Sequence, residues 1–318
     1  MNTERDDAGR GTGEVTIKAQ AERRTPEAIA WSGVGIVGAG AVGTALGVAI
    51  SRSGWPVVAV VSRDATRRHR FCTLVPGARA FVEPAAISDV ADLIIVAVPD
   101  DTIAEVAAQI RLHSGQAIVH TSGAVDAEVL TEAVMEGGAM GGFHPLVSFT
   151  SDVERSVAGI AGATIAIEGD DRLAKLLAAL AEAIGGSTVR LPRGAKAAYH
   201  AAAVLASGGL VALLDAIVAL GSIVGLDERV SLAVFGRLME QTLTNVRGMG
   251  IAASLTGPVT RGDVGTVAAH MAALEAQAPD VVELYLATAR RQIRIAEERG
   301  TLSPNQAARV RRVLAKER

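Results

Sequence analysis

The chain has 318 residues, 49% of them hydrophobic and 20% charged, with a formal net charge of −3 at pH 7. This length allows two domains and a sizeable buried core, and the near-balanced charge gives no electrostatic basis for binding nucleic acid or a membrane surface. Aromatic residues make up only 3%, which argues against stacking platforms for single-stranded nucleic acid. No unbroken apolar run reaches the roughly 18 residues of a membrane span. We therefore expect neither a nucleic-acid nor a membrane partner.

Residues 1–31 are polar and charged and show no helical or strand periodicity, so we expect a disordered tail. They lack the apolar core of a signal peptide. The single cysteine, Cys72, excludes an internal disulfide and fits a reducing compartment. These features predict a cytoplasmic protein whose fold begins near residue 32.

A glycine-rich turn follows the first apolar run of the chain. Residues 34–43 read VGIVGAGAVG, and small apolar residues typical of a buried helix come next. In this G-x-G-x-x-G spacing Gly38 allows the tight turn, Gly40 lets the backbone approach a pyrophosphate, and Gly43 lets the helix pack closely on the strand. A purely structural turn is the alternative, but the strand–turn–helix context and the phosphate-attracting helix start favour a dinucleotide. The predicted phosphate-binding residues are Gly38, Ala39, Gly40, Ala41, Val42 and Gly43.

The end of the second predicted strand, residues 57–61, indicates which dinucleotide binds. Sites for NAD carry an acidic residue here that binds the ribose 2′-hydroxyl. This chain has Ser62 and Arg63 instead, with Arg67 and Arg68 one helical turn later. A hydroxyl and guanidinium groups suit the 2′-phosphate of NADP. We predict that Ser62, Arg63 and Arg67 bind NADP(H); a solvated helix face is the alternative for Arg67 and Arg68.

Three further apolar runs, residues 92–98, 117–120 and 139–143, predict strands that end in polar turns. Open α/β sheets bind ligands beyond the carboxyl ends of their strands. We therefore expect these three ends to lie side by side over the nicotinamide, with Val98 and Pro99 against the cofactor.

A β-α-β unit within residues 163–191 completes the predicted sheet. We predict an α/β N-terminal Rossmann domain with a mostly parallel, doubly wound sheet over residues 32–192. Strand patterns then stop, which predicts an all-α C-terminal domain for substrate binding and dimerisation over residues 193–318. Residues 195–224 are apolar nearly all round, so we expect one long central helix buried on most faces. Further helices are predicted over residues 228–249, 264–277, 280–298 and 303–318.

Two candidate substrate groups lie at predicted strand ends. Ser122 and Gly123 precede a helix expected to run to about residue 136, so their N–H groups are placed to take a substrate carboxylate; an ordinary serine-capped turn is the alternative. His144 precedes a proline just past another strand, where it can bind a substrate or act as an acid–base group. The alternative for His144 is a histidine that ties down the loop.

A third candidate group begins the apolar segment 195–224. Lys196 and His200 are four residues apart and share a helix face, with Tyr199 beside them. A cation on an apolar helix is costly without a partner, which favours a ligand-binding or catalytic lysine. A lysine that reaches solvent at the helix start is the alternative.

This combination resembles the superfamily of β-hydroxyacid dehydrogenases and 6-phosphogluconate dehydrogenase, with ketopantoate reductase and pyrroline-5-carboxylate reductase as relatives of similar layout. Those dehydrogenases carry Ser-Gly-Gly for the substrate carboxylate and a lysine followed by an asparagine for proton transfer. Here residues 122–124 read Ser-Gly-Ala, and Tyr199 and His200 stand where the asparagine is expected. The turn at His144 is similar to the His-Pro turn of prephenate dehydrogenases, in which the histidine contacts the substrate.

A more specific resemblance, over residues 33–318, is to proteins that join a Rossmann-like domain to a C-terminal domain of unknown function 2520. That family often has an asparagine after the serine at position 207, where this chain has Gly208. Its marks occur here in order: His-x-Ser-Gly-Ala at 120–124, Phe-His-Pro-Leu at 143–146, Lys-x-x-Tyr-His at 196–200 and Leu-Thr-Gly-Pro-x-x-Arg-Gly-Asp at 255–263.

The resemblance implies an NADP-dependent oxidoreductase that moves a hydride between nicotinamide and a small carboxylate-bearing carbonyl or imine. A ketopantoate-like 2-oxo acid and a pyrroline-5-carboxylate-like cyclic imine both remain open as substrates. In this interpretation Lys196 protonates the oxygen or nitrogen, His144 and His200 orient or relay the proton, and Ser122 holds the carboxylate. No metal is expected.

The loop at residues 255–263 offers a further anion contact. We expect Arg261, together with Asn245 and Tyr199, to contact the substrate; the alternative is a loop that only turns the chain and caps the next helix. The superfamily dimerises through its C-terminal half, so a homodimer is expected. The alternative function is a non-catalytic NADP-binding regulatory or scaffold protein. The absence of the expected asparagine favours this alternative.

Overall fold

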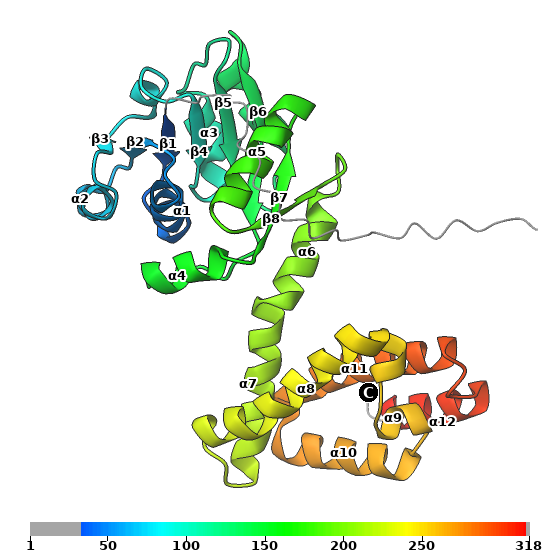
Figure 1. Ribbon diagram of the computed structural model, residues 1–318. Helices are drawn as coiled ribbons and strands as arrows, with labels where there is room; N and C mark the ends of the chain where they lie inside the picture. Colours follow the sequence, from blue (N-terminus) through cyan, green and yellow to red (C-terminus); the bar gives the residue numbers. More distant parts are fainter. Residues whose placement is uncertain (1–32, 316–318) are drawn as a thin grey trace, which may run out of the picture. The chain divides into compact units, whose positions relative to one another are not determined.

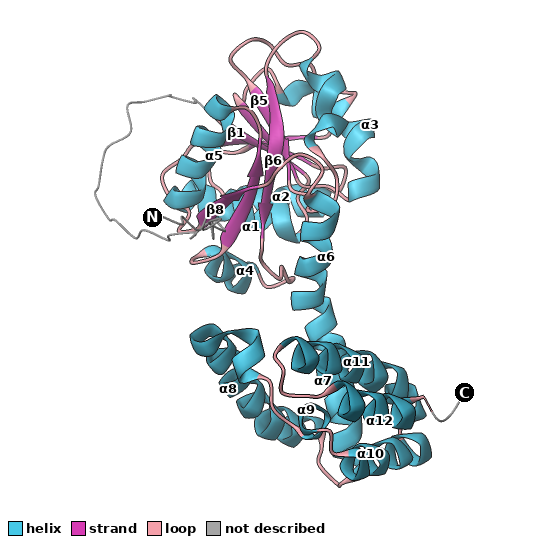
Figure 2. Ribbon diagram, turned by 90° about the vertical axis from the view of Figure 1, so that its right-hand side faces the viewer, coloured by secondary structure: helices cyan, strands magenta, loops and turns pink. Residues whose placement is uncertain are grey.

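The computed structural model describes residues 33–315 (Figure 1), and the predicted tail over residues 1–31 lies outside them. The chain divides into two compact units, the first ending at Gly194 and the second beginning at Ala195. Strands lie in the first unit, whereas the second is built of helices (Figure 2). The predicted class, an α/β Rossmann domain followed by an all-α domain, is confirmed.

An eight-stranded sheet in the order β3-β2-β1-β4-β5-β6-β7-β8 forms the centre of the first unit. Neighbouring strands run parallel except β6 and β7, so the mostly parallel, doubly wound prediction is confirmed. The strand order reverses on either side of β1, which is where such sheets bind ligands. The strands are β1 (Val34–Val37), β2 (Val57–Val61), β3 (Arg79–Phe81), β4 (Leu93–Val96), β5 (Ala117–His120), β6 (Ala139–Pro145), β7 (Thr164–Glu168) and β8 (Ser187–Arg190).

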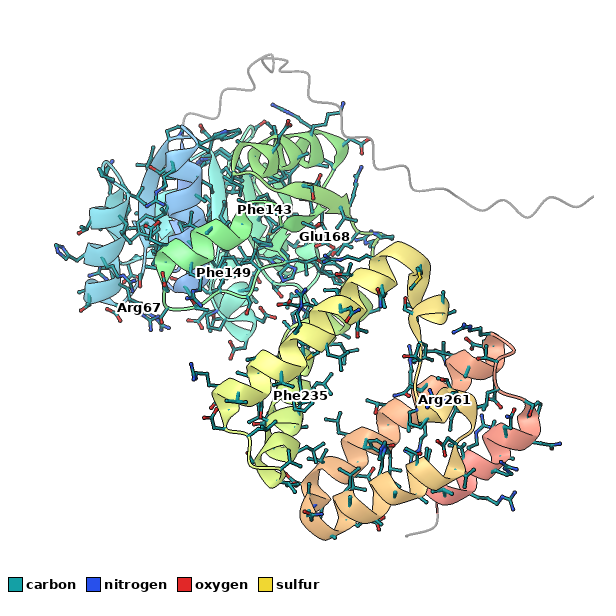
Figure 3. All side chains as sticks on the ribbon, turned by 60° about the horizontal axis from the view of Figure 1, so that its bottom comes forward. Arg67, Phe143, Phe149, Glu168, Phe235 and Arg261 are labelled. Atoms are coloured by element: carbon teal, nitrogen blue, oxygen red, sulfur yellow. The ribbon has the colours of Figure 1, made fainter. Side chains whose placement is uncertain are left out.

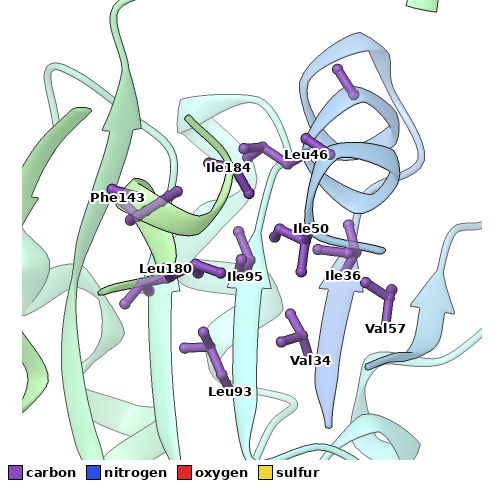
Figure 4. Close-up of a cluster of buried hydrophobic side chains, with 14 of the residues drawn as sticks. Val34, Ile36, Leu46, Ile50, Val57, Leu93, Ile95, Phe143, Leu180 and Ile184 are labelled. Atoms are coloured by element: carbon purple, nitrogen blue, oxygen red, sulfur yellow. The ribbon is translucent and has the colours of Figure 1, made fainter. Parts of the chain in front are cut away.

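Hydrophobic side chains cover both faces of the sheet, because successive residues of a strand point to opposite sides. On one face Ile95 belongs to a cluster with Leu46 and Leu180 from the covering helices (Figure 4). Its neighbour Ile94 belongs to the cluster of the other face, with Ile103. The covering elements are α1 (Ala41–Arg52), α2 (Ala65–Leu74), α3 (Ile103–Ala107), α4 (Val153–Ile160) and α5 (Asp171–Ala183), with 3-10 helices η1 (Pro84–Ile87), η2 (Asp100–Thr102) and η3 (Ala127–Val134).

The segment after β5 differs from its prediction. In place of an α-helix that opens at Ser122, the chain forms an irregular turn and then the 3-10 helix η3. The cause is local: the Ser122 hydroxyl accepts hydrogen bonds from the N–H groups of Ala124 and Val125. A serine side chain that binds nearby backbone groups competes with the helical hydrogen-bond pattern.

The second unit is all-helical, as predicted. A hydrophobic cluster of residues from α9 to α12, including Val267, Ile293 and Val310, forms its largest core. Gly250 has φ 80° and interrupts α8 close to the predicted helix end at residue 249. The helices are α6 (Lys196–Ala206), α7 (Gly208–Ile223), α8 (Glu228–Ser254), α9 (Pro258–Arg261), α10 (Val264–Gln277), α11 (Val282–Glu298) and α12 (Pro304–Leu314), with the 3-10 helix η4 (Pro279–Val281).

The prediction of one long buried helix over residues 195–224 is wrong in two respects. Ser207, with φ −116° and ψ −85°, separates α6 from α7. In addition Lys196, Ala216 and Gly221 are the only buried residues of the two helices, and Leu205 and Val211 retain 73% and 66% of their accessible surface. An apolar composition predicts that a segment becomes covered, but here the chain's own core is built by α9 to α12.

The apolar segment Lys196–Ile223 also bears on the membrane prediction. By length and composition alone this segment could cross a membrane, although it contains no unbroken apolar run of that length. The break at Ser207 divides it into helices of 11 and 16 residues. A membrane-spanning helix needs about 20, so neither helix alone has that length.

Candidate functional site

Three strands of the first unit, β1, β4 and β5, end on one row of the sheet. Val37 pairs with Val96, Val96 with His120, and His120 with Gly142 of β6. The segments that follow β1, β4 and β5 therefore leave the sheet at the same carboxyl edge, where β6 continues beyond its last pair with β5. This agrees with the predicted neighbourhood of the glycine turn, Pro99, Ser122 and His144.

The three glycines of the turn have three different surroundings. Gly38 has φ +105°, and a Cβ there would lie 2.3 Å from the carbonyl oxygen of Ala97. A Cβ on Gly43 would lie 1.9 Å from the carbonyl oxygen of Gly38, so helix α1 can approach the turn only without a side chain. Around a Cβ on Gly40, by contrast, no atom lies within 4 Å. The backbone at Gly40 thus faces open space, as a backbone that receives a pyrophosphate must.

Helix α1 begins at this open backbone. Gly40 is its N-cap residue, no side chain caps the helix, and its first turn carries no acidic residue. The first N–H groups of a helix have no partner inside the helix and attract anions. The helix start therefore fits a phosphate.

A cavity of about 640 Å³ extends from the glycine turn along the carboxyl edge. Ligand pockets commonly measure about 300–1,000 Å³. Ala41, Val42 and Gly43, which were predicted to bind the cofactor, do not line this cavity and instead form the first turn of α1. The predicted residues that line it are Gly38, Ala39, Gly40, Ser62, Arg63, Arg67, Val98 and Pro99.

The cavity is also lined by residues that the sequence did not single out. They come from the segment after β3 and from η2 and α3, and no motif marks them. The signal that could have found the first group is its place just after a strand of the same sheet. These residues are Val82, Glu83, Pro84, Thr102, Glu105, Val106 and Gln109.

The charged side chains that follow β2 differ in whether they are already paired within the protein. Asp64 caps α2 by accepting the N–H of Arg67 at 3.1 Å, and its carboxylate lies 3.4 Å from the Arg67 guanidinium. Arg68 donates to the carbonyl oxygen of Ser62. No hydrogen bond or ion pair with another described residue engages the exposed side chain of Arg63, which lines the cavity. Arg63 is therefore the guanidinium best placed for an added phosphate, whereas the Asp64 carboxylate is paired with Arg67.

Ser122 is more fully engaged than predicted. Its hydroxyl donates to Oδ2 of Asp100 at 2.8 Å and accepts the N–H groups of Ala124 and Val125 at 3.1 and 3.0 Å. Its own N–H donates to Nδ1 of His120 at 3.2 Å. A hydroxyl has one donor and two acceptor sites, so these bonds use all three. The predicted direct contact between Ser122 and a substrate carboxylate would require the Asp100 bond to break.

His144 lies inside β6 and not beyond its end, which corrects the predicted strand boundary. Residues 142–145 pair with the antiparallel strand β7, where His144 is opposite Ala166. His144 is still two residues beyond Gly142, the last residue of β6 that pairs with β5. It is half-buried at the same edge as Ser122, so the strand supports the predicted position.

The remaining predicted residues belong to the second unit. Lys196 is the first residue of α6 and is only 2% exposed, unlike a lysine that reaches solvent at a helix end. Tyr199 and His200 follow on the same helix and are half-buried. Burial raises the pKa of the Tyr199 hydroxyl, so this group stays protonated at neutral pH.

Asn245 on α8 and Arg261 at the end of α9 are exposed (Figure 3). Asp263 caps α10 by accepting the N–H of Thr266 at 3.0 Å, as the capping interpretation of this loop expects. The hydrogen bonds from Thr266, and to a lesser degree the charge of Arg261, hold the pKa of Asp263 below its usual value. Residues 33–315 contain no group of three or more His, Cys, Asp or Glu side chains arranged to hold a metal ion.

Comparison with known proteins assigns both units. Residues 20–145 match the Rossmann-like domain, and residues 163–292 match the domain of unknown function 2520. The chain joins these two domains. The second match begins before β7, so this conserved unit includes the last part of the sheet as well as the helices. No curated protein matches the chain.

Solved structures of similar fold cover most of the chain. A provisionally assigned NADP oxidoreductase from Bacteroides fragilis has a TM-score of 0.68 and 23% identity, covering 82% of this chain and 97% of its own. A protein from Thermotoga maritima has a TM-score of 0.63 and 27% identity, covering 83% and 98%. A reductive aminase from Aspergillus terreus in complex with NADPH and ethyl levulinate has a TM-score of 0.64 and 18% identity, covering 87% and 98%. The similarity to the first and third of these structures shows that this chain shares their fold.

Proposed function

We propose that this protein is an NADP-dependent oxidoreductase that transfers a hydride between nicotinamide and a small carboxylate-bearing carbonyl or imine. The observation that carries the proposal is the cavity at the carboxyl edge, with Gly40 in open space at the start of α1 and Arg63 on its wall. Two of the proteins of similar fold, the provisionally assigned NADP oxidoreductase and the reductive aminase in complex with NADPH, support it.

In this proposal the first unit holds the cofactor. The backbone at Gly40 and the start of α1 bind the pyrophosphate, and Ser62 and Arg63 bind the 2′-phosphate, assisted by Arg67. Val98 and Pro99 line the way towards the nicotinamide half. The bound cofactor supplies the hydride, and the protein supplies position and proton transfer.

The second unit supplies the proton donor. Lys196 carries an ammonium group at a site with little solvent, where it would donate a proton to the substrate oxygen or nitrogen as hydride reaches the carbon. His200, one turn later on the same helix, and His144 of the first unit would orient or relay that proton. Arg261, with Asn245 and Tyr199, would contact the substrate, and Arg261 would bind its carboxylate.

The proposal is tested by titrating the purified protein with NADPH and with NADH and following the nucleotide fluorescence. We expect clear preference for NADPH, followed by turnover in a screen of 2-oxo acids and cyclic imines. Binding without any turnover would favour the regulatory or scaffold alternative. Binding of neither nucleotide would contradict the proposal.

We also propose that a second copy of the chain covers the apolar surface of α6, α7 and α8. These helices hold most of the exposed large hydrophobic side chains, and contiguous apolar surface of this kind marks interaction sites. A Cβ on Gly221 of α7 would lie 2.2 Å from the Oγ of Ser231 on α8, so these two helices pack closely against each other. The exposed residues are Val204, Leu205, Leu210, Val211, Ile223, Val224, Leu232, Val234, Leu238, Leu243, Met249 and Ile251.

A further inference from the structure

The hydrogen bond between Ser122 and Asp100 places a carboxylate at the edge where the substrate is expected. The two residues are 22 positions apart in the sequence, and they follow the adjacent strands β5 and β4. The bond is 2.8 Å long, and Ser122 is only 6% exposed. The serine is in turn held by the N–H groups of Ala124 and Val125. Asp100 is thus fixed by a rigid turn of the neighbouring strand.

The carboxylate of Asp100 belongs to a residue beside the cavity wall in the sequence, although Asp100 itself does not line the cavity. This residue is exposed, and within residues 33–315 Ser122 is the one hydrogen-bond partner of its side chain, through Oδ2. Oδ1 therefore remains available to a ligand. Pro99 and Thr102 on either side line the cavity of about 640 Å³, and β4 and β5 lie on the side of β1 opposite to β2, where the nicotinamide half of a dinucleotide binds.

We propose that Asp100 binds the positively charged nitrogen of the substrate, which makes the reacting group an iminium carbon and not the carbonyl of a 2-oxo acid. The inference rests on the proposed function and selects between its two substrate classes. A carboxylate repels the carboxylate of a 2-oxo acid placed beside it and attracts a cation. The N–H groups of Ser122, Ala124 and Val125, which could otherwise have received an anion here, already bond to His120 and to Ser122 itself.

The chemistry balances with the groups already proposed: Lys196 first donates its proton to the imine nitrogen and so forms the iminium, and no further reactant is needed. Hydride adds to the iminium carbon and forms a C–H bond, while the C=N π electrons become the lone pair of the nitrogen. The cationic iminium becomes a neutral amine, and NADPH is oxidised to NADP⁺. Asp100 binds the cationic form that accepts hydride, and Ser122 acts as a positioning residue that holds the carboxylate.

The test uses pyrrolidinium, the protonated cyclic amine that resembles the product, and lactate, a 2-hydroxy acid anion. Both are titrated by calorimetry into the full-length protein saturated with NADP⁺. We expect pyrrolidinium to bind about tenfold more tightly than lactate in the wild type, and Asp100→Asn to remove that preference. Asparagine keeps an oxygen that accepts the Ser122 hydroxyl, so the turn is retained. Ser122→Ala should weaken pyrrolidinium binding less than Asp100→Asn.

Asp101→Asn is the matched control, because Asp101 is the neighbouring exposed carboxylate and has no bond to Ser122. It should change pyrrolidinium binding less than about twofold. The role of Asp100 would be overturned if both variants lost pyrrolidinium binding equally, or if Asp100→Asn left it unchanged. It would also be overturned if the wild type bound lactate more tightly than pyrrolidinium, or did not bind pyrrolidinium at all. Failure of the proposed function has a different readout, the absence of NADPH binding in the fluorescence titration. In that case the same pyrrolidinium titration without nucleotide still decides whether Asp100 binds a cation.

Discussion

The two units treat similar apolar sequence in opposite ways. In the first unit the small apolar helix α1 is covered by its own chain, and Leu46 and Ile50 have no exposed surface. In the second unit α7 is at least as apolar, yet Val211 keeps 66% of its surface. An apolar pattern therefore predicts that a segment will be buried, but it does not identify the surface that buries it. Within the described residues, α1 is covered by side chains of its own unit, whereas much of the surface of α7 is not.

The largest expected effect tests the chemistry assigned to the second unit. Replacing Lys196 by Ala should lower kcat about 10²- to 10⁴-fold, the usual contribution of a general acid. NADPH affinity should stay within a factor of about two, because the proposed cofactor residues all lie in the first unit. Steady-state kinetics and nucleotide fluorescence measure the two quantities. Lys175→Ala, at an exposed lysine of α5, is the control. A normal rate in Lys196→Ala would remove this residue from the mechanism.

The glycine turn could be predicted in detail because its geometry is contained in ten consecutive residues. The spacing of Gly38, Gly40 and Gly43 implies a turn, an open backbone and a close packing contact, and each is present. The bond from Ser122 to Asp100 could not be predicted, because it depends on how two separate strand ends meet. The same holds for Glu83, which reaches the cavity only through the pairing of β3 with β2.

The helical half was harder to predict for a different reason. Its all-helical class was predicted because strand patterns stop after residue 192, but the apolar composition of α6 and α7 did not show which of their side chains are covered. The break at Ser207 is followed by Gly208 and Gly209, a helix-weakening pair that the apolar residues on both sides outweighed in the prediction. The prediction that the strand ends before His144 was wrong, because β6 continues through His144 and Pro145 and pairs there with β7.

Substitutions at two glycines of the first unit separate an effect on stability from an effect on nucleotide binding. Gly43→Ala should destabilise the protein by about 3 kcal/mol, at the upper end for overpacking, because its methyl group would meet the backbone of Gly38. Gly40→Ala should leave the thermal midpoint within about 2 °C, since its Cβ enters open space. It should nevertheless weaken NADPH at least about tenfold by blocking the pyrophosphate. Thermal unfolding and fluorescence titration measure both; equal stability of the two variants would contradict the assignment.

The apolar surface of the second unit gives the next prediction. Replacing Val211 and Leu238 together by Arg should convert a dimer into monomers, because a charge buried in an apolar interface without a partner is strongly unfavourable. We expect at least about a hundredfold weaker association by sedimentation velocity, with an unchanged circular dichroism spectrum. Met135→Arg is the control, at a 77% exposed side chain of the first unit. A wild-type monomer that binds lipid vesicles would show instead that a membrane covers this surface.

The smallest expected effect concerns a single charge on the wall of the cavity. Arg63→Ala should weaken NADPH about tenfold, because a charge-assisted hydrogen bond to the 2′-phosphate is lost, while NADH affinity should change less than about twofold. Arg67→Ala should cost less, since the Arg67 guanidinium already pairs with Asp64 at 3.4 Å. Removing that arginine also releases the carboxylate of Asp64 towards the same phosphate, so part of its effect is repulsion and should fade at high salt. If Arg63→Ala weakens the binding of NADPH and NADH equally, Arg63 does not bind the 2′-phosphate. The proposed reason for a preference for NADP would then be wrong.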